Sequence, residues 1–209
     1  MDAITRFRVS ALVAGIIFLA GYCIVLLIPG GGDVDAEDFT DFYDSDGKRN
    51  LAFLLLIALV LGSLAMVWFF TELRTFLPAG ALTSVGYASA MIGAALVIAG
   101  GGIMAAPLGV QMNSDSDFVG IPIAHTFAQA GLAVMLLGGM TAFLLATLLT
   151  SLALRAGNLV PQWVWIVGFV VAIVMLGSFI WAPGVVFPLW VILLGLVGVG
   201  TRRGEERLT

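Results

Sequence analysis

Histidine, cysteine and lysine are almost missing from this chain, since each occurs once among 209 residues. A single cysteine excludes an internal disulfide, a multi-thiolate metal site and a dithiol redox centre. A single histidine cannot supply the paired axial ligands of a membrane haem. Charged residues make up only 11% of the chain, whereas a soluble domain carries about 25%. Water is therefore not the main solvent for this protein.

Motifs of the common enzyme classes are also missing. The sequence has no His-Glu-x-x-His for zinc, no Gly-x-Ser-x-Gly nucleophile turn and no glycine loop with lysine for nucleotide phosphates. The apolar runs contain essentially no ionisable residue, which argues against a proton-coupled transporter with a carboxylate relay. We therefore expect no enzymatic activity, no cofactor and no metal centre.

Six long apolar runs fill most of the sequence, which is 61% hydrophobic. About 20 apolar residues cross the hydrocarbon of a bilayer as a helix, because only a helix pairs its own backbone groups there. We predict an all-α fold, with residues 1–209 forming a single transmembrane domain of six helices. The predicted spans lie near Val9–Ile28, Leu51–Thr71, Thr83–Ala106, Gly120–Ser151, Val160–Ala182 and Val185–Gly200. Pro183-Gly184 is expected to form a tight outer turn between the last two.

Positive charges are sorted between the two sides that six spans would create. Short loops rich in arginine and lysine stay in the cytoplasm during insertion. Only Lys48 and Arg49 would lie on the outer side, so we predict that both termini are cytoplasmic and that the protein lies in a cell membrane. Eight arginines against one lysine suggest a GC-rich prokaryotic source. The seven arginines on the inner side are Arg6, Arg8, Arg74, Arg155, Arg202, Arg203 and Arg207.

The first outer loop, at about residues 30–50, is acidic and carries seven acids between Asp33 and Asp46. Asp41, Asp44 and Asp46 are a candidate weak cation site, although the ligand spacing of a calcium loop is missing. A solvated acidic surface is the alternative interpretation.

Small residues predict how the helices pack, because helices in lipid associate by close van der Waals approach. Gly86, Gly93 and Gly100 recur every seven residues, with Ala90 on the same strip, so we expect the third span at the centre of the bundle. A hinge at residues 100–102 is the alternative role for the glycines there. Matching small surfaces are offered by Ala58 and Gly62 in the second span, and by Ala14 and Gly21 in the first.

A few polar side chains are candidates for function. His125 and Gln129 are four residues apart and share a helix face, and together with Tyr87 they are a candidate ligand or proton site, since imidazole titrates near neutral pH. An interfacial hydrogen-bonding role is the alternative for His125. Glu72 is expected at the inner mouth beside Arg74, and Cys23 is expected to be a buried core thiol.

The segment Gly157-Asn158-Leu159-Val160-Pro161-Gln162-Trp163-Val164-Trp165-Ile166-Val167-Gly168 resembles a stretch of uncharacterised six-span prokaryotic membrane proteins. In those proteins a proline and a tryptophan open the fifth span and a glycine follows. Phe42-Tyr43-Asp44, Arg49 and Trp68-Phe69 are also similar to them. The resemblance implies a six-span bundle and no particular activity.

Two functions remain open from the sequence. The first is a non-catalytic accessory or interaction subunit, which would meet the lipid bilayer and other membrane proteins, or a second copy of itself, through small-residue helix faces. The second is a small carrier or channel for an apolar or weakly polar solute, which would use a seam between spans three and four. A nucleic-acid partner is not expected.

Overall fold

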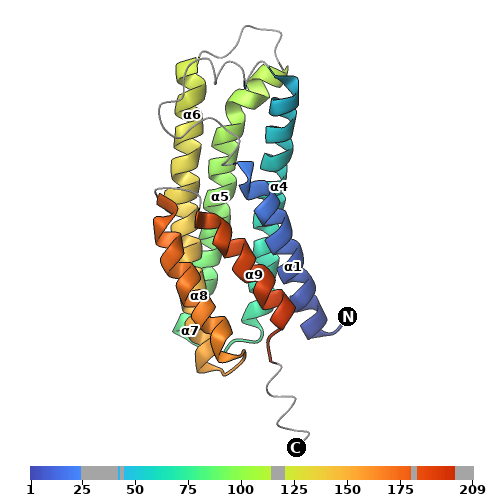
Figure 1. The fold of residues 1–209 in the computed structure, drawn as a ribbon, viewed down its shortest axis with the longest axis vertical. Helices are drawn as coiled ribbons and strands as arrows, with labels where there is room; N and C mark the ends of the chain where they lie inside the picture. Colours follow the sequence, from blue (N-terminus) through green and yellow to red (C-terminus); the bar gives the residue numbers. More distant parts are fainter. Residues whose placement is uncertain (25–41, 43–44, 114–120, 180–182, 201–209) are drawn as a thin grey trace, which may run out of the picture.

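A computed structural model describes residues 1–24, 42, 45–113, 121–179 and 183–200, and these residues form helices without strands. Four apolar helices are long enough to cross a membrane, and two are shorter (Figure 1). The long ones are α1 (Ala3–Tyr22), α4 (Asp46–Arg74), α5 (Ala81–Asn113) and a fourth built from α6 (Ile121–Ala133), the π-helix η1 (Val134–Met140) and α7 (Thr141–Ala156). The short ones are α8 (Gln162–Met175) and α9 (Val186–Val197), joined through the 3₁₀ turns η2 (Leu176–Phe179) and η3 (Pro183–Val185).

The long helices extend beyond the apolar runs because polar residues cap their first turns. Asp2 accepts a hydrogen bond of 2.6 Å from the backbone N–H of Thr5 and starts α1 well before Val9. Ser45 accepts from the N–H of Lys48 and starts α4. Apolar periodicity marks the buried part of a helix, whereas these caps determine where it begins.

Helices α4, α5 and α6–α7 lie side by side, and α1 packs against α4 and α9 (Figure 1). The main neighbours of α5 are α4 on one side and α6–α7 on the other. The third span therefore lies between the second and the fourth. Its glycine strip faces one partner, and a strip of small residues specifies close approach on one side only.

The glycine strip of α5 forms the closest contact with the fourth long helix. A Cβ added to Gly100 would lie 2.6 Å from the carbonyl oxygen of Gly131, and one added to Gly93 would lie 3.1 Å from that of Gly139. Gly86 faces Leu149 in the same way. The predicted small-residue seam is confirmed, with α6–α7 as its partner. Because this seam is closed by backbone contact, it leaves no room for a solute at these positions.

Small residues also set the crossing of α1 and α4. A Cβ on Gly21 would collide with the backbone of Leu59, beside Ala58. A Cβ on Gly62 would lie 2.5 Å from the Cα of Phe18. The small surfaces predicted in the first two spans therefore face each other.

Aromatic rings fill the space where α1, α4, α7 and α9 meet. Phe187 of α9 stacks on Phe143 of α7 with ring centroids 4.5 Å apart, and Phe18 of α1 meets both rings edge-on. Phe70 of α4 also stacks on Phe187, with ring centroids 6.5 Å apart. All four side chains are buried. These four helices thus meet in an aromatic cluster to which α5 contributes no ring.

The last two apolar runs form shorter helices than the sequence predicted. Helices of 14 and 12 residues measure about 21 and 18 Å, less than the roughly 30 Å hydrocarbon core. Gly184 lies against Tyr22, the last residue of α1, and against Met140, so the turn packs within the bundle below the upper ends of α4, α5 and α6 (Figure 1). The location of this turn on the outer side of the membrane stays a prediction. Gly198, with φ of +77°, ends α9.

Candidate functional site

The structure brings together two of the three residues predicted to form a ligand site. His125 and Gln129 lie on α6, with 3.3 Å between their Nε2 atoms. Gln129 is exposed and His125 is half-buried. Their hydrogen bond joins neighbouring turns of one helix, as their spacing of four residues predicts.

Tyr87 lies at the opposite end of the bundle from this pair. Its hydroxyl is 3.4 Å from the Thr71 hydroxyl, and the guanidinium of Arg74 lies over its ring, 4.9 Å from the centroid. Next to Tyr87, Gly86 packs against Leu149, which is 24 residues beyond His125 along a continuous helix and so about 36 Å away. The three residues do not form one site.

One residue of the candidate cation site lies within the described part of the chain. Asp46 begins α4 and forms an ion pair with Arg49 one turn later. Asp41 and Asp44 lie outside the described residues. Across the described residues, no group of three or more histidine, cysteine or acidic side chains is placed to hold a metal ion.

The structure also gives the surroundings of Glu72 and Cys23. Glu72 pairs with Arg6 of α1, with 3.6 Å between carboxylate and guanidinium nitrogen, while Arg74 turns to Tyr87. Cys23 is exposed and not a core thiol. It directly follows the end of α1, where Gly21 supplies the close contact with α4.

Buried hydroxyl groups in the bundle bind to their own helices. Ser63 donates to the carbonyl of Leu59, Thr147 to that of Phe143 and Ser151 to that of Thr147, each at 2.8 Å. Such bonds satisfy a hydroxyl without a partner on another helix. These side chains therefore do not form a polar path between helices.

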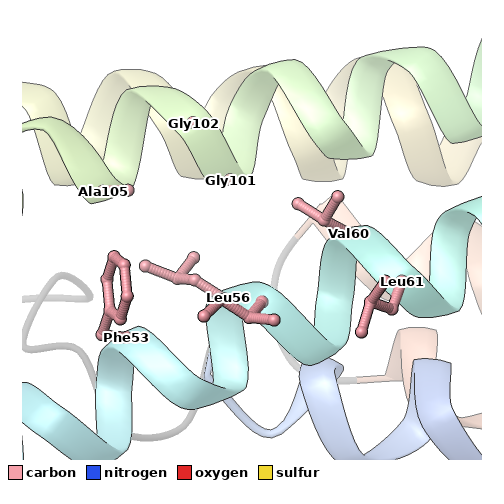
Figure 2. Close-up of a pocket in the computed structure, with 8 residues that line it drawn as sticks. Phe53, Leu56, Val60, Leu61, Gly101, Gly102 and Ala105 are labelled. Atoms are coloured by element: carbon pink, nitrogen blue, oxygen red, sulfur yellow. The ribbon is translucent and has the colours of Figure 1, made fainter.

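An apolar groove of about 250 Å³ lies between α4 and α5. Its α4 wall consists of Phe53, Leu56, Ile57, Val60 and Leu61. Figure 2 shows the side chains of Phe53, Leu56 and Val60 directed toward a stretch of α5 with small residues, Gly101, Gly102 and Ala105.

The floor of this groove exposes helix backbone. A Cβ added at Gly102 would meet no atom within 4 Å, whereas its neighbour Gly100 is packed tightly against α6. The three consecutive glycines thus serve two faces of a helix that continues unbroken from Ala81 to Asn113. The consecutive glycines Gly101 and Gly102 are the sequence feature that could have indicated this groove. The alternative role that the sequence suggests for them is a hinge.

Comparison of the chain with protein-family models, with curated protein sequences and with solved structures finds no match. The four long apolar helices and the apolar outer side chains are compatible with a helical membrane protein.

Proposed function

We propose that this chain is a multi-pass integral membrane protein that acts through its outer helix faces, as a non-catalytic accessory or interaction subunit. The observation that carries the proposal is the groove between α4 and α5, whose floor exposes helix backbone at Gly102. Small residues on a lipid-facing surface allow a second helix to approach closely, which is the main source of helix association in membranes. The proposed occupant is a helix of another membrane protein.

The proposed orientation places both termini in the cytoplasm of a prokaryotic cell. Arg6, Arg8, Arg74 and Arg155 gather at one end of the bundle, while Lys48 and Arg49 begin α4 at the other. Because α8 and α9 form a hairpin, its two ends lie on the same side whether or not the hairpin crosses the whole bilayer. The chain therefore crosses the membrane an even number of times whether the hairpin spans it or not. The positive-inside rule supports the same orientation in either case.

A carrier for an apolar solute is the second candidate function. The groove is lined by apolar side chains and has the volume to take part of a hydrocarbon chain. In this case the solute would enter from the lipid side between α4 and α5, and not through the closed seam between α5 and α6–α7.

Photocrosslinking in native membranes tests the proposed partner. A benzophenone amino acid at Ile57, which is 41% exposed and lines the groove, is expected to give a discrete protein adduct. The same probe at Ile16, which is 57% exposed on α1, is the matched control and should give none. Adducts with lipid or a small molecule alone at Ile57 would refute the interaction function and favour the carrier.

A blocking variant sharpens this experiment. Gly102→Leu places a side chain into open space in the groove, so it should remove the protein adduct at Ile57 while leaving the expression level unchanged. An adduct of undiminished yield in the Gly102→Leu protein would show that the partner does not occupy the groove.

A further inference from the structure

The end of the bundle that carries Arg6, Arg8, Arg74 and Arg155 is closed by contacts between distant segments. Phe7 of α1 meets Phe76 with ring centroids 5.7 Å apart. Gly157, after α7, packs against Pro78 of the same loop. The N–H of Gly200 donates to the carbonyl of Leu159 at 2.9 Å. These contacts connect the start of α1, the loop after α4, and the ends of α7 and α9 into one continuous surface.

Three arginines on this surface rest on neutral groups. Arg74 lies over the ring of Tyr87 and Arg155 over the ring of Trp165, each 4.9 Å from the centroid. The guanidinium of Arg8 lies against Gly198, at the C-terminal end of α9, where backbone carbonyls favour a positive charge. We refer to Arg8, Arg74 and Arg155 as the arginine collar.

Among the described residues, Glu72 and Asp2 are the carboxylates at this end of the bundle, and both are engaged elsewhere. Glu72 pairs with Arg6. Asp2 accepts the N–H of Thr5, and this backbone hydrogen bond lowers the pKa of the Asp2 carboxyl. Within the described residues, no ion pair joins a carboxylate to Arg8, Arg74 or Arg155, and all three are exposed. The collar thus presents three guanidinium groups, each held by an aromatic ring or a helix end, and none has an acidic partner in the described part of the chain.

We propose that the arginine collar binds the phosphate headgroups of anionic phospholipids at one membrane surface. Guanidinium groups form bidentate hydrogen bonds with phosphate oxygens, and stacking on a ring leaves the N–H edges of Arg74 and Arg155 available for them. Tyrosine and tryptophan rings favour the headgroup level, which places Tyr87 and Trp165 where lipid phosphates lie. The inference rests on the membrane location proposed above and not on the protein partner.

Lipid retention by the full-length protein tests the collar. The protein is reconstituted in nanodiscs of equal parts phosphatidylglycerol and phosphatidylcholine, then released into mild detergent, and its bound lipids are counted by native mass spectrometry. Phosphatidylglycerol should be enriched over phosphatidylcholine, and the enrichment should fall about fivefold for each collar arginine replaced by glutamine. Variants in which a collar arginine is replaced by lysine should retain part of the phosphatidylglycerol enrichment. Lys48→Gln, at the opposite end of the bundle, is the matched control and should retain all of it.

A second measurement needs no variant. Enrichment of phosphatidylglycerol in the wild-type protein should decline when sodium chloride is raised from 0.05 to 0.5 M, because screening weakens contacts between surface charges. Equal retention of the two lipids by wild-type protein that stays in the nanodisc, or an equal loss in Lys48→Gln, would overturn the inference. A protein that does not remain in the nanodisc at all would instead contradict the proposed membrane location.

Discussion

Replacing Gly100 by leucine should destabilise the purified protein by about 3 kcal/mol or more, whereas replacing Gly102 by leucine should change its stability by less than about 0.5 kcal/mol. A Cβ at Gly100 would lie 2.6 Å from the carbonyl oxygen of Gly131 and 2.9 Å from the backbone nitrogen of Met135. Backbone atoms cannot rotate away, so α5 and α6 must separate. At Gly102 the added side chain meets open space.

The two variants are matched because they place the same side chain two residues apart on one helix. Unfolding in detergent, titrated with sodium dodecyl sulfate and followed by tryptophan fluorescence, measures the difference directly. Equal stability of the two variants would show that α5 does not pack on α6 through its glycine strip.

Phe187→Ala is expected to cost about 3–5 kcal/mol, the usual range for removing a buried phenylalanine. This ring is fully buried and contacts Phe18, Phe70 and Phe143, so that it links α9 to three other helices. Its removal leaves a cavity that none of these helices can fill alone. The loss should appear in the same unfolding titration.

Leu189→Ala serves as the control for Phe187→Ala. Leu189 lies on the same helix but is 49% exposed, so its truncation should have a much smaller effect. If the two variants were equally stable, α9 would not be anchored by the aromatic cluster.

The sequence predicted the long helices and much of their pairing. Apolar length alone identified α1, α4, α5 and α6–α7, because a helix is the favoured way to pair backbone groups in lipid. The seven-residue spacing of Gly86, Gly93 and Gly100 predicted a close seam. It could not reveal which helix lies opposite, because that depends on glycines in another span, at Gly131 and Gly139.

The aromatic cluster and the short lengths of α8 and α9 could not be predicted from apolar length or residue spacing. Phenylalanine is as common on lipid-facing as on buried helix surfaces, so Phe18, Phe143 and Phe187 gave no sign that they meet. Hydropathy marked the last two runs as spans, since it does not register the break that η2 and Pro183 introduce between α8 and α9.

The sequence predicted which candidate residues lie together within one helix, but not which lie together across several helices. The pairing of His125 with Gln129 follows from helical spacing. The assignment of Tyr87 to the same site required knowledge of helix register, which composition does not supply. The sequence did not predict the groove between α4 and α5. A helix face that contacts lipid and a helix face that contacts another protein have the same apolar composition.

Cysteine accessibility in intact cells tests the central claim, a multi-pass membrane protein with both ends in the cytoplasm. In a Cys23→Ala background, single cysteines replace Thr40, Ala79 or Glu205 and are treated with a membrane-impermeant maleimide. We predict labelling of Thr40→Cys from outside, and labelling of Ala79→Cys and Glu205→Cys only after permeabilisation. Labelling of Ala79→Cys or Glu205→Cys in intact cells would contradict the account.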